Sequence, residues 1–227
     1  MSKATELWAK VFNEAIANQQ ERTTTNPVDW KAAGRATKAN PDKENGDWWA
    51  ENGPVMLENF FTAWDATGWQ VWTTPEGVPG IELEFNLDYG DVRIKSFVDL
   101  VAVTGDGELI IVDWKTGSNM PSNAMQLALY ATAVEKQFGL KPSAGYYYNA
   151  RNAVFEPADI GRWTIPLFTE LFRQFEDSVQ RRIFIPNLGM MCKSCFVKDY
   201  CYAYGGEYAE MLDPLYAIAQ QKEETSE

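Results

Sequence analysis

The sequence predicts an α/β fold, with a mixed central β-sheet flanked by helices and a cysteine-bearing segment near the C-terminus. Three observations predict it. A run of β-branched and apolar residues, 81–114, is interrupted twice by turn residues, as in a series of short strands. Segments with apolar residues at helical spacing precede and follow this run. All three cysteines lie within residues 192–201.

The N-terminal part, residues 1–76, is expected to be mainly helical. Apolar residues recur at helical spacing in residues 5–21 and again in residues 47–64. The stretch between them, residues 23–46, has few aliphatic side chains and many polar and turn residues. We therefore expect two helices joined by a loop.

Residues 77–150 are expected to form the core. We expect three strands joined by tight turns into an antiparallel meander, followed by a helix and a fourth strand. The three strands are residues 81–87, 92–103 and 109–114, the helix is 124–137, and the fourth strand is 144–148.

The C-terminal part, residues 151–212, begins with a long amphipathic helix, residues 164–182, and continues into the cysteine segment. The charged end of the chain, residues 213–227, is expected to be a flexible tail. With 227 residues, the length suits one domain, and we expect it to span residues 1–220.

Composition excludes several classes of protein. A hydrophobic fraction of 45 % is sufficient for a core, so disorder throughout the chain is excluded. No apolar run approaches the roughly 18 residues of a membrane span. The absence of histidine excludes histidine-dependent triads and zinc proteases of the H-E-x-x-H type. The N-terminus lacks the apolar stretch of a signal peptide and the few cysteines form no disulfide framework, so we expect a cytoplasmic protein.

The charge is strongly acidic but uneven. The net charge of −12 is unfavourable for indiscriminate binding to nucleic acid. Residues 141–200, however, hold eight basic and six acidic side chains. A polyanion could therefore be bound locally, against the repulsion of the whole chain.

Two carboxylates and a lysine are expected to converge at the centre of the sheet. Because strand side chains alternate, Asp113 and Lys115 share one face and Trp114 takes the other. Asp99 interrupts an otherwise apolar strand, where a carboxylate is unfavourable unless it is paired. Such a group suits a divalent cation, since Mg²⁺ and Mn²⁺ prefer oxygen ligands. The alternative is an ion pair at a strand end, with Asp99 an acid near a turn.

The motifs of this region resemble those of the PD-(D/E)XK nucleases, and more narrowly the RecB-like branch. That branch includes CRISPR-associated adaptation exonucleases and many small phage nucleases. The stretch SFVDLVAVTGDGELIIVDWKTG, followed by QLALY, carries the resemblance. It matches an aspartate on the second core strand, D-x-K with T-G on the third, and Q-x-x-x-Y on the next helix. The matching residues are Asp99, Asp113, Lys115, Gln126 and Tyr130.

The resemblance implies a restriction-endonuclease-like core and hydrolysis of phosphodiester bonds with Mg²⁺ or Mn²⁺. It implies that Asp99 and Asp113 hold the metal, with the backbone carbonyl of Trp114 as a further ligand. Lys115 would position the attacking water or stabilise developing charge. Two further residues would support the site or contact DNA, and they are Gln126 and Tyr130.

From the same resemblance we expect a DNA nuclease, an exonuclease rather than an endonuclease, acting in recombination or replication. Its substrate would be single-stranded DNA or duplex ends, its partner a helicase or recombinase, and its compartment the host cytoplasm if a phage encodes it. The alternative is a catalytically silent PD-(D/E)XK module that binds DNA or a protein.

Two positions depart from the family pattern. Many relatives carry a metal-binding histidine on the N-terminal helix, and this chain has none. Glu58 lies in the corresponding helix and could replace it, or it could be a solvated surface acid. Relatives often have a glutamate on the first core strand, where this chain has Glu82 and Glu84 on one strand face. We favour Glu82 as the ligand, the alternative being an exposed polar edge.

The cysteines follow the spacing Cys192-x2-Cys195-x5-Cys201. In RecB-like exonucleases with an iron–sulfur cluster, three C-terminal cysteines of this spacing join a fourth near the N-terminus, which this chain lacks. Four interpretations remain open: a [4Fe–4S] cluster with a non-cysteine ligand, a three-cysteine cluster, zinc with a carboxylate, or three packed thiols. We expect a bound metal, with iron–sulfur ahead of zinc.

The run Tyr146-Tyr147-Tyr148, together with Trp114 and the N-terminal tryptophans, suits either base stacking or a packed core. We favour the core.

Overall fold

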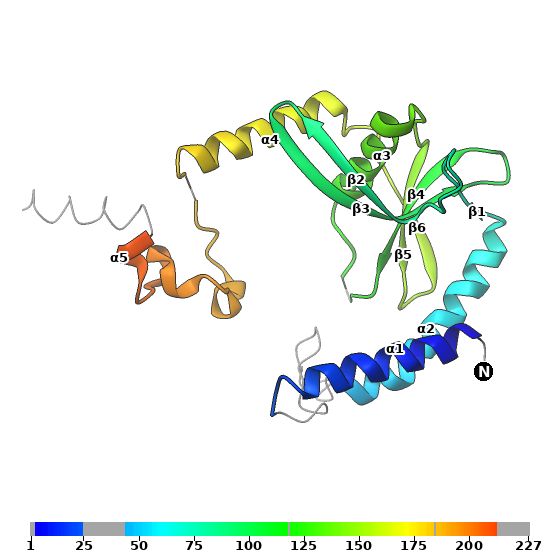
Figure 1. The fold of residues 1–227 in the computed structure, drawn as a ribbon, viewed down its shortest axis with the longest axis horizontal. Coiled ribbons are helices and arrows are strands. Elements are labelled where there is room, and N and C mark those ends of the chain that lie inside the picture. Colours follow the sequence, from blue (N-terminus) through cyan, green and yellow to red (C-terminus); the bar gives the residue numbers. More distant parts are fainter. Residues whose placement is uncertain (1–2, 25–43, 118, 184, 213–227) are drawn as a thin grey trace, which may run out of the picture. The chain divides into compact units, whose positions relative to one another are not determined.

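The computed structural model describes residues 3–24, 44–117, 119–183 and 185–212 (Figure 1). The chain divides into two compact units. The first comprises Met1–Asp88 and Arg93–Phe168, and the second Tyr89–Val92 and Thr169–Glu227. The expected single domain over 1–220 and its internal boundaries stay predictions. The expected tail, 213–227, and most of the expected loop, 23–46, lie outside the described residues.

A mixed sheet forms the centre of the fold, as the sequence predicts. The strands follow the order β1-β3-β4-β5-β6, with β2 also pairing with β3. The β3–β4 pair is antiparallel, β4–β5 is parallel, and β5–β6 is antiparallel. The strands are β1 (Gln70–Val71), β2 (Ile81–Tyr89), β3 (Val92–Val103), β4 (Leu109–Lys115), β5 (Ala144–Asn149) and β6 (Val154–Ala158).

Two of these strands are not predicted by the sequence pattern. β1 has only two residues, too few for an alternation of apolar and polar side chains to be recognised. β6 contains Pro157, a residue that argues against a strand interior. Because β6 is the last strand in the order, this proline lies on an edge strand, where it is tolerated.

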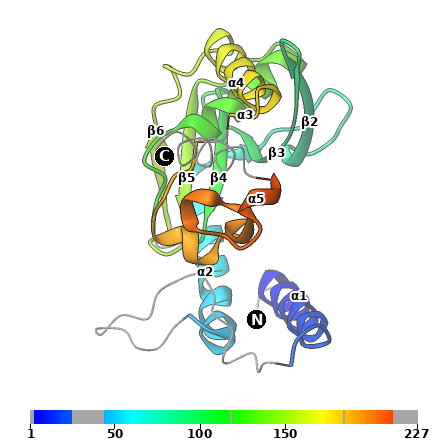
Figure 2. The same cartoon turned by 90° about the vertical axis from the view of Figure 1, so that its left-hand side faces the viewer.

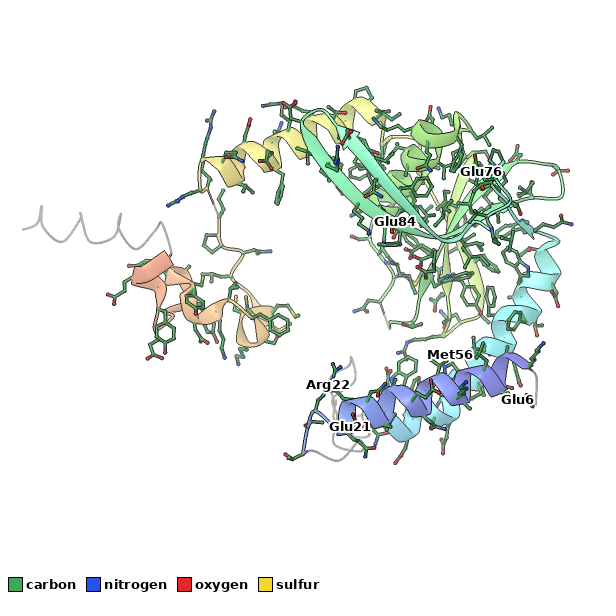
Figure 3. The ribbon with its side chains drawn as sticks, viewed as in Figure 1. Glu6, Glu21, Arg22, Met56, Glu76 and Glu84 are labelled. Carbon is green, nitrogen blue, oxygen red and sulfur yellow. The ribbon has the colours of Figure 1, made fainter. Side chains whose placement is uncertain are left out.

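Helix α2 (Gly46–Thr67) covers one face of the sheet. It begins at Asn45, whose side chain accepts a hydrogen bond from Trp48 N, and ends at Gly68 in the left-handed conformation. Its apolar side, including Met56 (labelled in Figure 3), packs on a cluster from the sheet. The buried members of this cluster are Leu100, Ala102, Ile110, Val112, Tyr148 and Ala150.

Helix α1 (Lys3–Gln20) packs beside α2 (Figure 2). The two helices approach closely at Gly53, where a Cβ atom would lie 2.2 Å from the Trp8 ring. Both helices are predicted by the sequence, with ends within three residues of those observed.

Helix α3 (Met125–Phe138) covers the opposite face of the sheet. Residues on β5 alternate between the two faces, so Tyr148 packs on the α2 side while Gly145 meets Leu127 of α3. Gly139, in the left-handed conformation, ends α3 where the sequence predicts.

The close approach at Gly145 gives a stability prediction. In Gly145→Ala the new Cβ would lie 2.9 Å from Ile160 and 3.2 Å from Leu127, so buried groups must shift. We expect the free energy of unfolding to fall by about 1–3 kcal/mol, as in other overpacked cores. Urea denaturation measures this change. Gly105→Ala is the matched control because its Cβ would meet nothing within 4 Å, and an equal loss in both variants would contradict the packing explanation.

Helix α4 (Ile165–Gln180) leads into the second unit. There Tyr89 and Phe172 pack with ring centroids 5.1 Å apart. The cysteine segment forms three short 3₁₀-helices and one turn of α-helix, which are η2 (Met190–Ser194), η3 (Lys198–Tyr200), η4 (Tyr202–Tyr204) and α5 (Ala209–Leu212). In the described part of the chain, no helix is long and apolar enough to cross a membrane.

Candidate active site

The two predicted aspartates lie where β3 and β4 begin to separate. The last registered pair of these strands is Leu100 with Val112, so Asp99 and Asp113 are the next residues along each strand. The backbone N–H of Trp114 donates a hydrogen bond of 3.0 Å to Asp99 Oδ2. This contact fixes the first carboxylate against the backbone of the strand that carries the second.

Asp113 is buried, with 1 % of its surface exposed. Burial raises the pKa of its carboxyl group, the nearby Asp99 charge adds to the rise, and Lys115 opposes it. Lys115 Nζ lies 2.6 Å from Asp113 Oδ2 as an ion pair. This ammonium group is the charged partner of the buried Oδ2 atom among the described residues. Because each carboxylate oxygen has two lone pairs, Oδ2 retains capacity for a further ligand beside the lysine.

A chain of hydrogen bonds connects the lysine to α3. Lys115 Nζ donates to Gln126 Oε1 at 2.8 Å, and Gln126 Nε2 donates to the Tyr130 hydroxyl, also at 2.8 Å. Gln126 and Tyr130 lie one turn apart on α3 and face the same strand end. Burial raises the pKa of the Tyr130 phenol, so it stays protonated as a hydrogen-bonding group at neutral pH.

Tyr147 belongs to this site, although the sequence favours a core role for it. It pairs with Asp113 in the β4–β5 register, and Lys115 Nζ lies 5.5 Å from its ring centroid. Its hydroxyl donates to the carbonyl of Asn123 at 3.0 Å. Burial first, and then the Asp113 charge, raise its pKa. The signal for this role in the sequence is strand alternation, because it places Tyr147, on the parallel neighbouring strand, on the same face of the sheet as Asp113.

Glu82 lies near the cluster and Glu84 is engaged elsewhere. The charges of Asp99, Asp113 and Glu82 each contribute to the raised pKa of Tyr130. Glu82 also has a positive φ of 48°, a strained conformation for a non-glycine residue. Glu84 (labelled in Figure 3) bonds Asn86 and lies 3.1 Å from Lys95, and the Asn86 bond leads the causes that lower its pKa. Among the described residues, Glu82 does not join the two aspartates in a group of three acids close enough to hold an ion, so its role as a ligand stays a prediction.

The structure does not bring Glu58 to the aspartates. It lies on the exposed face of α2, opposite the side that packs on the sheet. The sheet itself separates α2 from the face that carries Asp113. Sequence position alone places Glu58 in the helix where relatives carry histidine, but not on the side of the helix that such a ligand needs.

The site residues fit a divalent cation held by few protein ligands. Asp99 and Asp113 supply carboxylate oxygens, and the Asp113 carboxylate is buried. No group of three or more histidine, cysteine or acidic side chains within the described ranges is close enough to hold an ion. Mg²⁺ commonly binds through one or two carboxylates and retains several waters, so two aspartates are compatible with it.

The cysteines, like the aspartates, do not belong to a group of three potential ligands close enough to hold an ion in the part of the chain that the structure describes. Each of Cys192, Cys195 and Cys201 is a half-buried free thiol. The backbone N–H of Gly189 donates to Cys192 Sγ at 3.3 Å. The three thiols do not form a preassembled metal site among the described residues. Binding of a cluster or zinc by them stays a prediction.

The buried carboxylate gives a prediction about stability in metal-free solution. Since the pKa of Asp113 is raised above its ordinary value of 3.8 in the folded protein, ionisation favours the unfolded chain. The free energy of unfolding should therefore fall as the pH rises from the ordinary pKa through the raised one. Asp113→Asn should flatten this slope, and thermal melts in EDTA between pH 4 and about pH 8 measure it.

Adding Mg²⁺ should offset the loss of stability that ionisation of the buried Asp113 causes. An ion that binds only the folded state raises the free energy of unfolding by about 2.7 kcal/mol at 100 times its dissociation constant. The melting temperature of the wild type should rise, whereas Asp113→Asn should not respond. Glu58→Gln is the matched control, because it exchanges an exposed acid away from the site. A full Mg²⁺ response in Asp113→Asn would contradict the metal assignment.

Comparisons with known proteins agree with this geometry. Residues 4–202 match the PD-(D/E)XK nuclease superfamily. The Gene 69 protein of Mycobacterium phage D29 is 31 % identical over 195 residues, covering 76 % of this chain and 71 % of that protein. The Gene 69 protein of Mycobacterium phage L5 is 30 % identical over 182 residues, covering 63 % of this chain and 62 % of that protein.

Proposed function

The chain belongs to the PD-(D/E)XK nuclease superfamily, and on that premise we propose that it is a metal-dependent DNA nuclease, an exonuclease that uses Mg²⁺ or Mn²⁺. The observation that carries the proposal is the convergence of Asp99, Asp113 and Lys115 at one strand end, with the Asp113 carboxylate buried there.

In the proposed mechanism the two aspartates hold the metal, with the Trp114 carbonyl as a further ligand. A divalent cation at such a site activates a water and stabilises charge on the phosphate in the transition state. The Trp114 N–H holds the Asp99 carboxylate in place. Glu82, on β2, is proposed as an additional acid that would help to hold the ion.

Lys115 is proposed to position the attacking water and stabilise the developing negative charge. Its ammonium group already has three contacts in the structure, with Asp113, Gln126 and the Tyr147 ring. These contacts fix the long side chain before substrate binds, so less of its rotamer freedom is lost in the reaction. Gln126 and Tyr130 are proposed to orient the lysine from α3.

DNA is the proposed substrate, and host cytoplasm is the proposed location. The similarity to two mycobacteriophage proteins supports a phage-related role in recombination or replication, with a helicase or recombinase as partner. With a net charge of −12, the chain needs the divalent ion and local basic residues to approach a polyanion. Binding should therefore weaken steeply as salt rises.

The test compares linear with covalently closed circular DNA, incubated with purified protein in Mg²⁺ or Mn²⁺. An exonuclease should degrade the linear form to short products and leave the circle intact. Degradation of 5′-labelled and 3′-labelled strands then gives the polarity. Cutting of the circle would contradict exonuclease action but would still support nuclease activity. Binding of linear DNA without any cleavage would instead support the silent module.

A further inference from the structure

We propose that an apolar pocket beside the catalytic strand binds one unstacked base of the DNA strand. This inference rests on the proposed function. The pocket lies on the α2 face of the sheet, at the ends of β4 and β5, and has a volume of about 310 Å³. That volume is at the lower end of the ~300–1,000 Å³ typical of small-molecule sites. Half of its ten lining residues are aromatic, and they are Trp49, Phe60, Phe61, Trp114 and Tyr148.

The pocket and the metal-binding aspartates lie on the two faces of one strand end. Trp114 connects them, because its backbone N–H bonds Asp99 while its ring lines the pocket. Thr116, the next residue on that face, also lines it. A DNA strand whose phosphate reaches Asp113 is proposed to pass this strand end and to turn one neighbouring base into the pocket.

The wall of the pocket is built to hold its shape. The centroid of the Phe60 ring lies 4.8 Å from that of the Trp114 ring and 5.1 Å from that of the Tyr148 ring, and both pairs are arranged edge to face. Such pairs fix the ring orientations. A rigid aromatic surface loses little conformational entropy on binding, which favours stacking of a planar ligand.

Arg151 stiffens the rim of the pocket. Its guanidinium forms two hydrogen bonds of 2.7 Å to Glu44, and its Nε donates to the carbonyl of Thr116 at 2.9 Å. The same group lies 5.9 Å from the Trp49 ring centroid and 5.3 Å from that of Trp48. Because Glu44 already neutralises it, Arg151 supports the rim and is not a phosphate ligand.

One polar group in the wall lacks a partner. Tyr148 is 2 % exposed, and its hydroxyl has no hydrogen-bond partner among the described residues. Burial raises the pKa of this phenol, so it stays a neutral donor and acceptor. The oxygen itself is fully buried, so the hydroxyl is not presented to the pocket, and Tyr148 lines the pocket with its ring.

The ligand class follows from these features. Stacking on aromatic rings holds any base by its face and leaves the other edges in water, so the pocket should not select sequence. The base must be unpaired to enter, which predicts a preference for single-stranded DNA or for duplex ends that open.

Phe61 provides the test because it lines the pocket and is 44 % exposed, so its removal should not threaten the fold. Binding is measured by fluorescence anisotropy in Ca²⁺, with single-stranded oligonucleotides that carry one abasic site at successive positions from the end. Val55→Ala is the control, since Val55 is 52 % exposed on the same helix and does not line the pocket.

For the wild type, we expect an abasic site at one position to weaken binding about 5- to 150-fold, the range for loss of one stacked base. Phe61→Ala should weaken binding of the intact strand and then be insensitive to that abasic site, whereas Phe61→Trp and Val55→Ala should behave as wild type. Wild-type affinity in Phe61→Ala, or additive losses at every position, would overturn the pocket assignment.

Cleavage in Mg²⁺, measured in parallel, separates this inference from the proposed function. Protein that shows the position-specific coupling but cuts nothing would refute the nuclease and keep the base pocket. Protein that cuts DNA but shows no such coupling would refute the base pocket and keep the nuclease.

Discussion

Replacing Asp113 by Asn is expected to abolish metal-dependent cleavage while the protein stays folded. A carboxamide has nearly the same volume as the carboxylate but is a poor ligand for Mg²⁺. Loss of the ion removes several kcal/mol of transition-state stabilisation, so the rate should fall by about 10³-fold or more. Single-turnover cleavage of end-labelled linear DNA measures this rate.

Asp99→Asn should behave in the same way, because Asp99 is fixed beside Asp113 by the Trp114 N–H. Glu84→Gln is the matched control, since Glu84 pairs with Lys95 and lies on an exposed strand face. Its rate should equal that of the wild type. Cleavage at the wild-type rate by Asp99→Asn or Asp113→Asn would remove the basis of the metal assignment.

Replacing Lys115 by Ala is expected to lower turnover by about 10²- to 10⁴-fold, the range for loss of a positioned catalytic group. DNA binding should weaken only modestly, because Asp99 and Asp113, which would hold the ion, remain in place. The rate and the dissociation constant are measured on the same oligonucleotide, the latter in Ca²⁺.

Lys95→Ala is the control for this variant, because Lys95 is an exposed lysine on β3 that pairs with Glu84. If Lys115→Ala lost binding and turnover in equal proportion, Lys115 would be a phosphate anchor instead of a catalytic group.

Local pattern was sufficient to predict the centre of the fold. Alternation along a strand placed Asp113 and Lys115 on one face, and the short turns made the antiparallel neighbours recognisable. The helical spacing of Gln126 and Tyr130 placed them on one face of α3. The structure adds that this face meets Lys115 directly, a contact that depends on the packing angle of α3 and not on spacing.

Other parts depend on tertiary contacts that spacing does not encode. Tyr147 joins the site because β5 lies parallel to β4 with Asp113 as its register partner, and a register across a helical crossover cannot be read from composition. The orientation of Glu58 follows from which side of α2 carries the larger apolar residues. The pocket lined by Trp114 also depends on tertiary packing, because the Phe60 ring contacts both Trp114 on β4 and Tyr148 on β5.

The most direct test of the central claim is cleavage of one labelled linear DNA by wild-type protein in Mg²⁺, in Mn²⁺ and in EDTA, with the Asp99→Asn, Asp113→Asn double variant alongside. We predict shortening of the strand only for the wild type and only with a divalent ion. Undiminished cleavage in EDTA, or equal cleavage by the double variant, would contradict a metal-dependent nuclease centred on these two aspartates.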